Sequence, residues 1–265
     1  MAPLKLPDFF TLCLWACGGV VLLFILAPLL HMSLNVSPGM LTQTATDAEV
    51  LRSIRITLLT ALAAALLFSL AAVPFAWFLA RRKFPGKGVL LGIIDLPVII
   101  PHSTAGIALL SVLNRESALG RLAETFGFSF IGNPAGIALA MAFVSLPFLI
   151  NASREGFASV PQRLEKTGLT LGASPWTVFF TISLPLARRS ILTGFVMMIA
   201  RGLSEFGAVI IVAYHPMVMP VLIYERFTSF GLSYARGAAV VFLGVCLVFF
   251  IILRLLSGRQ YHAQR

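Results

Sequence analysis

The chain has 265 residues, of which 58% are hydrophobic and 11% are charged, and its mean hydropathy is +0.95. A soluble globular protein carries about 25% charged residues, so this composition excludes a soluble domain and predicts burial in a lipid bilayer. The net charge of +10 does not indicate nucleic acid, because the basic residues stand in short clusters beside apolar segments, as the positive-inside rule describes.

Apolar segments long enough to cross a hydrocarbon core of about 30 Å recur along the chain. The first is longer than the apolar core of a cleaved signal peptide, which has about 7–15 residues, so we expect a retained membrane helix. In total the sequence predicts six membrane helices, at residues 9–30, 56–80, 89–113, 134–150, 191–213 and 237–253.

The positive charges predict the orientation of these helices. With both termini in the cytoplasm, the cytoplasmic segments hold 13 of the 20 lysines and arginines, which is the bias that the positive-inside rule requires. Residues 35–53 and 114–133 then form external loops, and residues 214–236 form a partly embedded external loop or short helix. We therefore expect an all-α polytopic membrane protein with both termini cytoplasmic.

The third predicted span is interrupted. Pro97 and Pro101 each remove a backbone donor and disturb the helix. His102, Ser103 and Thr104 follow, and two roles stay open for them: donating hydrogen bonds to a passing oxyanion, or satisfying the freed backbone groups.

The fifth predicted span contains two charged residues. Arg201 and Glu205 are spaced i, i+4 and so share one helical face. A charge inside a membrane costs about 3 kcal/mol on insertion scales and is usually paired or functional. The pair is either a structural salt bridge or part of a translocation pathway, in which Arg201 attracts an oxyanion and Glu205 limits its affinity.

We expect no metal, cofactor or catalytic site in this chain. The four histidines lie at different predicted membrane depths, and the three cysteines sit in apolar runs as packing residues. The nearest match to a phosphate-binding loop, FPGKG at 84–88, lacks the first glycine and the final Ser or Thr. If the protein uses ATP, another chain binds it.

The cytoplasmic loop between the fourth and fifth spans has its own helix signals. Ser159 with Gln162 three residues later predicts a capping box that opens a helix, and Gly172 predicts its end. Ser174 followed by Pro175 predicts a second short helix. Two short helices around a glycine corner make a rigid projection that suits a docking partner.

This loop contains Glu165, Gly172 seven residues later, and the sequence ISLP at 182–185. The spacing resembles the EAA motif of the permease subunits of importer-type ABC transporters. Lys166 and Thr167 stand where that family has two alanines, so the match rests on Glu165, Gly172 and the placement of the loop two spans before the C-terminus.

The resemblance covers residues 52–254, the expected permease core of a single transmembrane domain at 1–265, with residues 155–185 as the cytoplasmic coupling loop. Two segments, 94–110 and 200–227, are similar to permeases of the molybdate/tungstate branch, and sulfate permeases have related segments. The resemblance implies the type I ABC importer permease fold and ATPase-coupling roles for five residues: Glu165, Gly172, Ala173, Ser174 and Pro175.

The resemblance also implies a complex in the cell (inner or cytoplasmic) membrane. Its other members are a second copy of the permease, two cytoplasmic ATP-binding-cassette subunits that bind ATP and Mg, and an extracytoplasmic oxyanion-binding protein. Closure of the ATPases moves the coupling loops and switches the membrane helices between inward-open and outward-open. The implied function is ATP-driven import of a tetrahedral oxyanion, and molybdate or tungstate is the substrate that the resemblance favours.

Three alternatives stay open from the sequence. The first is a sulfate/thiosulfate-type ABC permease, and the second is an ion-gradient-driven secondary transporter. Secondary transporters often have broken helices in both halves, and this sequence shows a break in the third span with no matching break in the second half. The third alternative is a membrane assembly factor that transports nothing.

Overall fold

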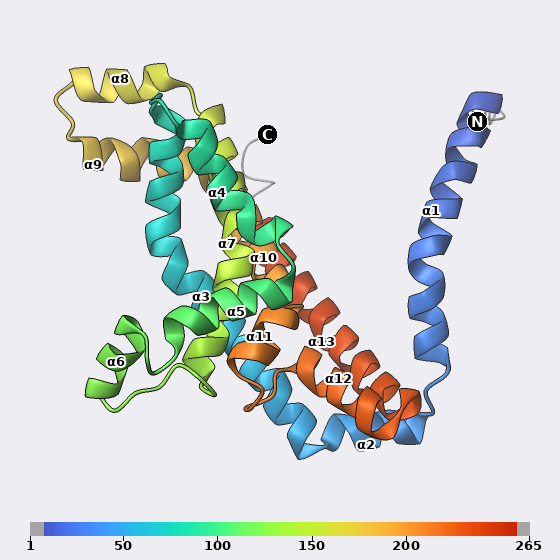
Figure 1. The fold of residues 1–265 in the computed structure, drawn as a ribbon. Coiled ribbons are helices and arrows are strands. Elements are labelled where there is room, and N and C mark those ends of the chain that lie inside the picture. Colours follow the sequence, from blue (N-terminus) through green and yellow to red (C-terminus); the bar gives the residue numbers. More distant parts are fainter. Residues whose placement is uncertain (1–7, 259–265) are drawn as a thin grey trace.

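The computed structural model describes residues 8–258, and this range contains helices and loops with no strand. Figure 1 shows the arrangement of the helices. In chain order they are α1 (Phe9–Leu34), α2 (Pro38–Thr46), α3 (Ala48–Arg81), α4 (Lys87–Ile99), α5 (His102–Leu113), α6 (Ala118–Thr125), α7 (Pro134–Ser159), α8 (Gln162–Thr170), α9 (Pro175–Val178), the π-helical turn η1 (Phe179–Ser183), α10 (Leu184–Leu203), α11 (Gly207–Val212), α12 (Met219–Phe230) and α13 (Leu232–Gly258).

The described helices bear out a multi-pass membrane protein. Five helical runs are long and apolar enough to cross a membrane, and the bent pair α4–α5 is a sixth candidate. The five are α1, α3, α7, the run from α9 through α10, and α13. This number agrees with the six spans that the sequence predicts.

Helix α7 lies at the centre of the fold and packs against both α3 and α10. It begins where the Asn133 side chain accepts a hydrogen bond from the backbone N–H of Ala135. Its buried face mixes small and large side chains, and many residues that α3 buries are small, which lets membrane helices approach closely. The alanines that α3 buries are Ala61, Ala64, Ala65, Ala72 and Ala76.

The α4–α5 span is broken, the fifth span is followed after a short interruption by α11, and α5 and α11 pack on each other. Helices α4 and α5 meet at 109°, because Pro101 forces the preceding Ile100 into an extended conformation. Helix α10 ends at Leu203, and α11 begins after residues 204–206. The second half of the chain therefore does contain a broken helix, contrary to the sequence-based expectation.

Glycines allow α5 and α11 to touch. A Cβ atom added at Gly106 on α5 would lie 2.9 Å from the Cβ of Ile211 and 3.0 Å from the Cα of Ala208. A Cβ added at Gly207, the first residue of α11, would lie 2.6 Å from the Cβ of His102. The two short helices are thus one packed unit.

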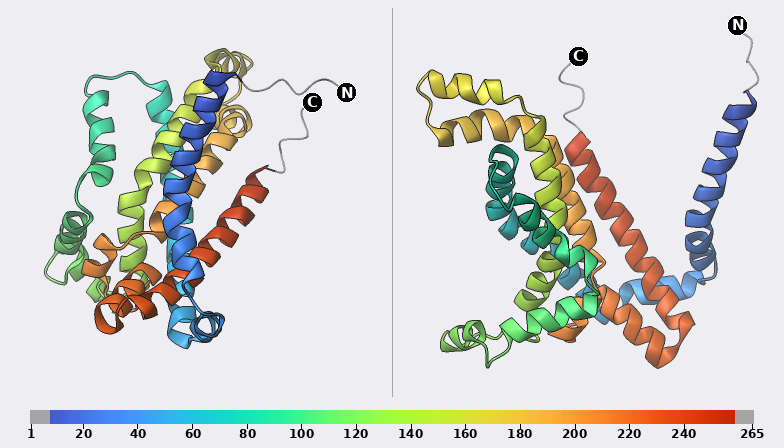
Figure 2. Two further views of the ribbon diagram at one scale, coloured as in Figure 1. Left: turned by 90° about the vertical axis from the view of Figure 1, so that its right-hand side faces the viewer. Right: turned by 45° about the horizontal axis from the view of Figure 1, so that its top comes forward.

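Helix α1 stands apart from the other helices, as Figure 1 and the right-hand view of Figure 2 show. None of the residues in its apolar membrane window is buried within this chain. Its whole apolar surface is therefore available to lipid or to another protein.

The predicted limits of the fifth span, residues 191–213, are wrong. The second loop helix does not stop before the membrane: α9, η1 and α10 form one continuous helical run from Pro175 to Leu203. The π-turn η1 keeps the run continuous, since the N–H of Leu184 bonds to the carbonyl of Phe179 five residues earlier. The span consequently starts and ends earlier than hydropathy alone indicates.

The predicted external segments also contain helices. Residues 35–53 include α2 and the start of α3, whose N-terminus is capped by the Asp47 side chain. Residues 114–133 include α6. In segment 214–236, α12 confirms the expected short helix, and α13 begins at Leu232, before the predicted Gly237.

The α5–α11 contact predicts a position-dependent effect of alanine. Gly106→Ala must displace the backbone of α11, and overpacking of this kind costs about 1–3 kcal/mol. We expect a lower unfolding temperature for the purified protein in detergent, measured by tryptophan fluorescence. Gly92→Ala on α4 is the matched control, because nothing lies within 4 Å of the added Cβ atom. Equal unfolding temperatures of the two variants would contradict the packing described.

Candidate functional site

Helices α8 and α9 form a compact hairpin at one end of the molecule (Figure 1). Gly172 sits at their corner with φ +89°, a left-handed conformation that favours glycine. Its N–H donates to the carbonyl of Leu169, and the N–H of Ala173 donates to the carbonyl of Gly168, which is the Schellman arrangement. The predicted stop at Gly172 is confirmed.

The start of α9 is also as predicted, while the start of α8 is not. Ser174 is the N-cap of α9 and its hydroxyl accepts from the N–H of Thr177. Ser159, in contrast, is the last residue of α7, and its hydroxyl donates to the carbonyl of Gly156. Pro161 takes the N-cap position of α8 without a side-chain bond, so the predicted capping box of Ser159 and Gln162 is wrong.

Glu165 is buried at the base of this hairpin and is held inside the chain. The guanidinium of Arg81 donates two hydrogen bonds to its carboxylate, from Nε at 2.8 Å and from Nη2 at 2.7 Å. The Ser183 hydroxyl donates to the same carboxylate at 2.6 Å, and Trp77 Nε1 lies 3.4 Å from it. Bidentate, charge-assisted contacts of this kind are the strongest hydrogen bonds in proteins.

The Arg81–Glu165 pair joins three segments. Arg81 is the last residue of α3, Glu165 lies in α8 and Ser183 ends the π-turn at the base of α10. Arg81 also donates to the carbonyl of Val160, between α7 and α8. A displacement of the hairpin therefore has to move α3 and the start of α10 with it.

The environment keeps the Glu165 carboxyl ionised. Burial raises its pKa, but hydrogen bonds from Arg81 and Ser183, the charge of Arg81 and a contact from Trp77 outweigh burial, so the pKa lies below its ordinary value of 4.5. Because the folded-state pKa is lowered, the carboxylate stabilises the fold fully above about pH 4.5. That stabilisation is lost only as the pH falls through the lowered value.

The outer surface of the hairpin presents apolar side chains instead of Glu165. Leu171 at the corner is 82% exposed and Trp176 on α9 is 70% exposed. Gly172, Ser174 and Pro175 are exposed beside them, and Ala173 is half-buried. Exposed apolar groups on a rigid projection mark a protein-interaction surface.

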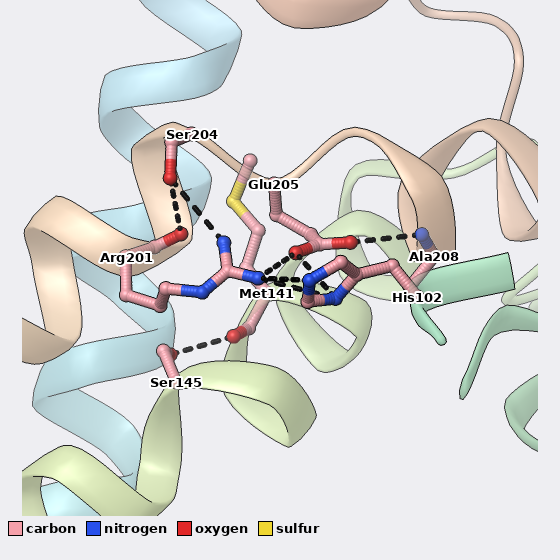
Figure 3. Close-up of polar contacts among 7 residues, drawn as sticks. All are labelled: His102, Met141, Ser145, Arg201, Ser204, Glu205 and Ala208. Carbon is pink, nitrogen blue, oxygen red and sulfur yellow. Dashed lines mark hydrogen bonds and ion pairs between the residues drawn. The ribbon is translucent and has the colours of Figure 1, made fainter. Parts of the chain in front are cut away.

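A second polar cluster lies at the two helix breaks, and Figure 3 shows its side chains. Arg201 Nη2 lies 2.9 Å from Glu205 Oε2 and 2.8 Å from His102 Nε2, and Arg201 Nη1 lies 3.3 Å from the Ser204 hydroxyl. Glu205 Oε1 accepts from the N–H of Ala208 at 2.9 Å. The Arg201 guanidinium is thus enclosed by groups of this chain.

The structure refines the sequence-based reading of this cluster. Arg201 and Glu205 do pair, but Glu205 lies in the break after α10 and not within a membrane helix. His102 joins the pair from α5. Ser103 and Thr104 are exposed.

The partners of Glu165 were missed by sequence reasoning. Arg81 was grouped with the basic residues that follow the second span, and Trp77 and Ser183 lie among apolar residues. Arg81 and Glu165 are 84 positions apart, so no local pattern joins them. Glu165 stands among polar residues in the sequence QRLEKTGLT, so its burial had no local signal.

Residues 72–260 match the family of binding-protein-dependent transport system inner membrane components. The chain belongs to this family. The resemblance to importer-type ABC permeases that the loop motif suggested is therefore confirmed.

Individual relatives of this chain are also named as permeases of transport systems. A molybdate/tungstate transport system permease protein from Thermococcus kodakarensis is 43% identical over 95% of this chain and 98% of its own length. A probable sulfate transport system permease protein from Chlorokybus atmophyticus is 34% identical over 77% of this chain and 73% of its own.

Solved structures show the same fold. A chain of a bacterial ABC transporter involved in the import of the acidic polysaccharide alginate superposes with a TM-score of 0.73 at 18% identity, over 96% of both chains. The permease fold expected from the sequence is thus confirmed.

The burial of Glu165 predicts how this permease responds to its loss. Glu165→Ala leaves the buried Arg81 guanidinium unpaired, and breaking a buried pair costs about 3–5 kcal/mol. We expect the hairpin to open more often, so that trypsin cleaves the purified permease after the exposed Arg163 and Lys166 about tenfold faster. Cleavage is followed by gel electrophoresis and mass spectrometry.

Glu155→Ala is the matched control for this experiment. Glu155 is an exposed carboxylate near the end of α7, and its loss should leave the cleavage rate unchanged. Equal rates for the Glu165 and Glu155 variants would show that the ion pair does not hold the hairpin.

Proposed function

We propose that this chain is the permease subunit of an ATP-driven importer that moves molybdate or tungstate into the cytoplasm by alternating access. The observation that carries this proposal is the 43% identity, over nearly the full length of both chains, to a permease named for molybdate/tungstate transport. The 34% identity over a smaller share to a sulfate permease makes a sulfate/thiosulfate-type permease the second candidate.

The proposed membrane is the cell (inner) membrane, with both termini in the cytoplasm. Support comes from the charge distribution, in which 13 of the 20 basic residues fall on that side under this orientation. The start of α1 and the end of α13 also point toward the end of the molecule where α8 and α9 project (Figure 1). The hairpin then lies in the cytoplasm.

Two ATPase subunits are proposed to bind the ATP and Mg, one docking on this hairpin and the other on the same hairpin of the second permease copy. Exposed Leu171 and Trp176, with Gly172, Ala173, Ser174 and Pro175 between them, form the proposed contact. Glu165 acts from inside, because its bonds to Arg81 and Ser183 make the docked hairpin continuous with α3 and α10. Rigid transmission is what a coupling element requires.

The remaining proposed partners occupy other surfaces. A second copy of this permease completes the membrane part, and the exposed α1 offers apolar surface for such a contact. An extracytoplasmic oxyanion-binding protein docks at the end opposite the hairpin, where α2, α6 and α12 lie (Figure 2).

The translocation pathway is proposed to run beside the break between α4 and α5 and the break between α10 and α11. Arg201 supplies positive charge for an oxyanion, Glu205 balances it, and His102 contacts both. Ser103 and Thr104 are exposed next to them and offer hydroxyl donors. Polar backbone breaks inside a membrane are tolerated where they line a cavity or are buried in protein.

Reconstitution tests the proposed function directly. The chain is co-purified with the ATPase and binding protein encoded beside it and placed in liposomes. We expect ATP-dependent uptake of molybdate and tungstate that requires all components, with sulfate a poor competitor.

Two outcomes would contradict this function. A preference for sulfate would favour the second candidate. Uptake driven by an ion gradient, without the ATPase, would favour a secondary transporter, for which the breaks in both halves are the supporting observation.

The docking surface generates a separate prediction. Leu171→Asp places a charge on the exposed corner, and we expect the amount of ATPase that co-purifies with the permease to fall about tenfold, since burying an unpaired charge is costly. Leu122→Asp is the control, because Leu122 is a 57% exposed leucine on α6 at the other end of the molecule. Normal co-purification of the Leu171 variant would exclude this corner as the contact.

A further inference from the structure

Figure 3 shows that groups of this chain occupy the Nη2 end of the Arg201 guanidinium. Its Nη2 group faces a Glu205 oxygen at 2.9 Å and the His102 ring at 2.8 Å, and its Nη1 group faces the Ser204 hydroxyl. Glu205 is 1% exposed, so no water competes for the carboxylate. In this conformation Glu205 and His102 therefore occupy the Nη2 group of Arg201, the donor that an incoming anion would need.

The Glu205 carboxylate offers Arg201 what a transported oxyanion would offer. A guanidinium binds carboxylate and tetrahedral oxyanions through the same N–H donors at the same distances. One Glu205 oxygen is fixed on the Ala208 N–H, and the other is directed at Arg201. That second oxygen occupies the place of an anion oxygen.

Arg201 and the groups that contact it lie on different helices, all of which also pack on α7. Arg201 lies in α10, which packs on α7 and α3. His102 begins α5, and the Glu205 carboxylate is bonded to α11; these two helices are in direct contact at Gly106 and Gly207. The backbone of Glu205 is at the joint, since its N–H still bonds to the Gly202 carbonyl of α10.

Because Arg201 lies on α10 while His102 and the Glu205 carboxylate are bound to α5 and α11, a movement between these helices can separate them. If the α5–α11 unit turns relative to α10, the Glu205 carboxylate and the His102 ring move away from Arg201 together. The guanidinium is then uncovered at the point where both membrane helices are broken. A buried unpaired arginine is strongly unfavourable, so the opening is favoured when an oxyanion is present to replace Glu205.

We propose that Glu205 is an internal substitute for the transported oxyanion. In the closed arrangement its carboxylate occupies Arg201; in the open arrangement an oxyanion takes its place, and the return of Glu205 expels the anion. Arg201 is paired in both arrangements, and Glu205 keeps the Ala208 N–H and the His102 ring, which move with it. The proposal rests on the proposed import function and assigns a binding site for a tetrahedral oxyanion at Arg201.

Binding measurements on the permease–ATPase complex in lipid nanodiscs test the exchange. Radiolabelled molybdate is titrated without the binding protein. Glu205→Gln keeps an oxygen for the Ala208 N–H and removes the competing charge, so we expect about tenfold tighter binding than in the wild type. Glu155→Gln, an exposed carboxylate on α7, should bind as the wild type does. Arg201→Gln should lose binding, and adding Glu205→Gln to it should restore none.

Two results would overturn the proposal. One is equal affinity in the Glu205 and Glu155 variants; the other is a gain that persists when Arg201 is replaced. If the Glu205→Gln variant does not assemble, the His102→Ala variant tests the proposal instead. The half-exposed His102 side chain contacts Arg201 but makes no bond to the start of α11, so its loss should not disturb that helix. It should tighten molybdate binding several-fold, and an unchanged affinity would overturn the proposal.

Uptake by the wild-type complex separates this proposal from the proposed function. Normal molybdate uptake with no affinity change in the variants overturns the Glu205 exchange alone. Absence of uptake for every oxyanion overturns the import function and the exchange with it. Tighter binding by Glu205→Gln together with slower uptake is the result expected if Glu205 expels the anion.

Discussion

The bidentate ion pair between Arg81 and Glu165 is the contact on which the arrangement of the α8–α9 end of the molecule depends. It lies where α3, α8 and the base of α10 meet, and a serine and a tryptophan complete the carboxylate's contacts. Without it, the α8–α9 hairpin would be joined to the bundle only through its chain ends and the apolar contacts of α9. With it, the hairpin is a rigid extension of two membrane helices.

Helix α3 carries this connection to the opposite end of the molecule. Its first turn is capped by Asp47, which also pairs with Arg226 of α12 at 2.6 Å. Almost three turns further along, the Thr57 hydroxyl accepts from the N–H of Met219 at the start of α12. Helix α3 is therefore tied to the α8–α9 hairpin at one end and to α12 at the other.

The broken helices complement this rigid rod. Helix α3 transmits a displacement of the hairpin along its length. The α4–α5 and α10–α11 breaks are points where the chain can bend, and both lie beside Arg201. A permease that alternates between two states needs both kinds of element. The cost of the intramembrane charges is limited because each one has a partner within the chain.

Sequence reasoning succeeded where the physical cause is local. Hydropathy located the spans, a left-handed position required Gly172, and Ser174 with Pro175 has the chemistry of a helix start. It failed where the cause is distant or depends on competition between neighbours. Pro161 displaced Ser159 as the cap of α8, and the π-turn joined α9 to the fifth span. The partner of Glu165 lies 84 positions away, so its burial was visible only in the folded chain.

The most direct test of the central claim is a double-mutant cycle on ATP-driven molybdate uptake by the reconstituted complex, using Arg81→Gln, Glu165→Gln and the two combined. If the residues act through each other, the double variant should lose no more uptake than the worse single variant. Losses that multiply in the double variant would show that Arg81 and Glu165 act independently and would contradict this account.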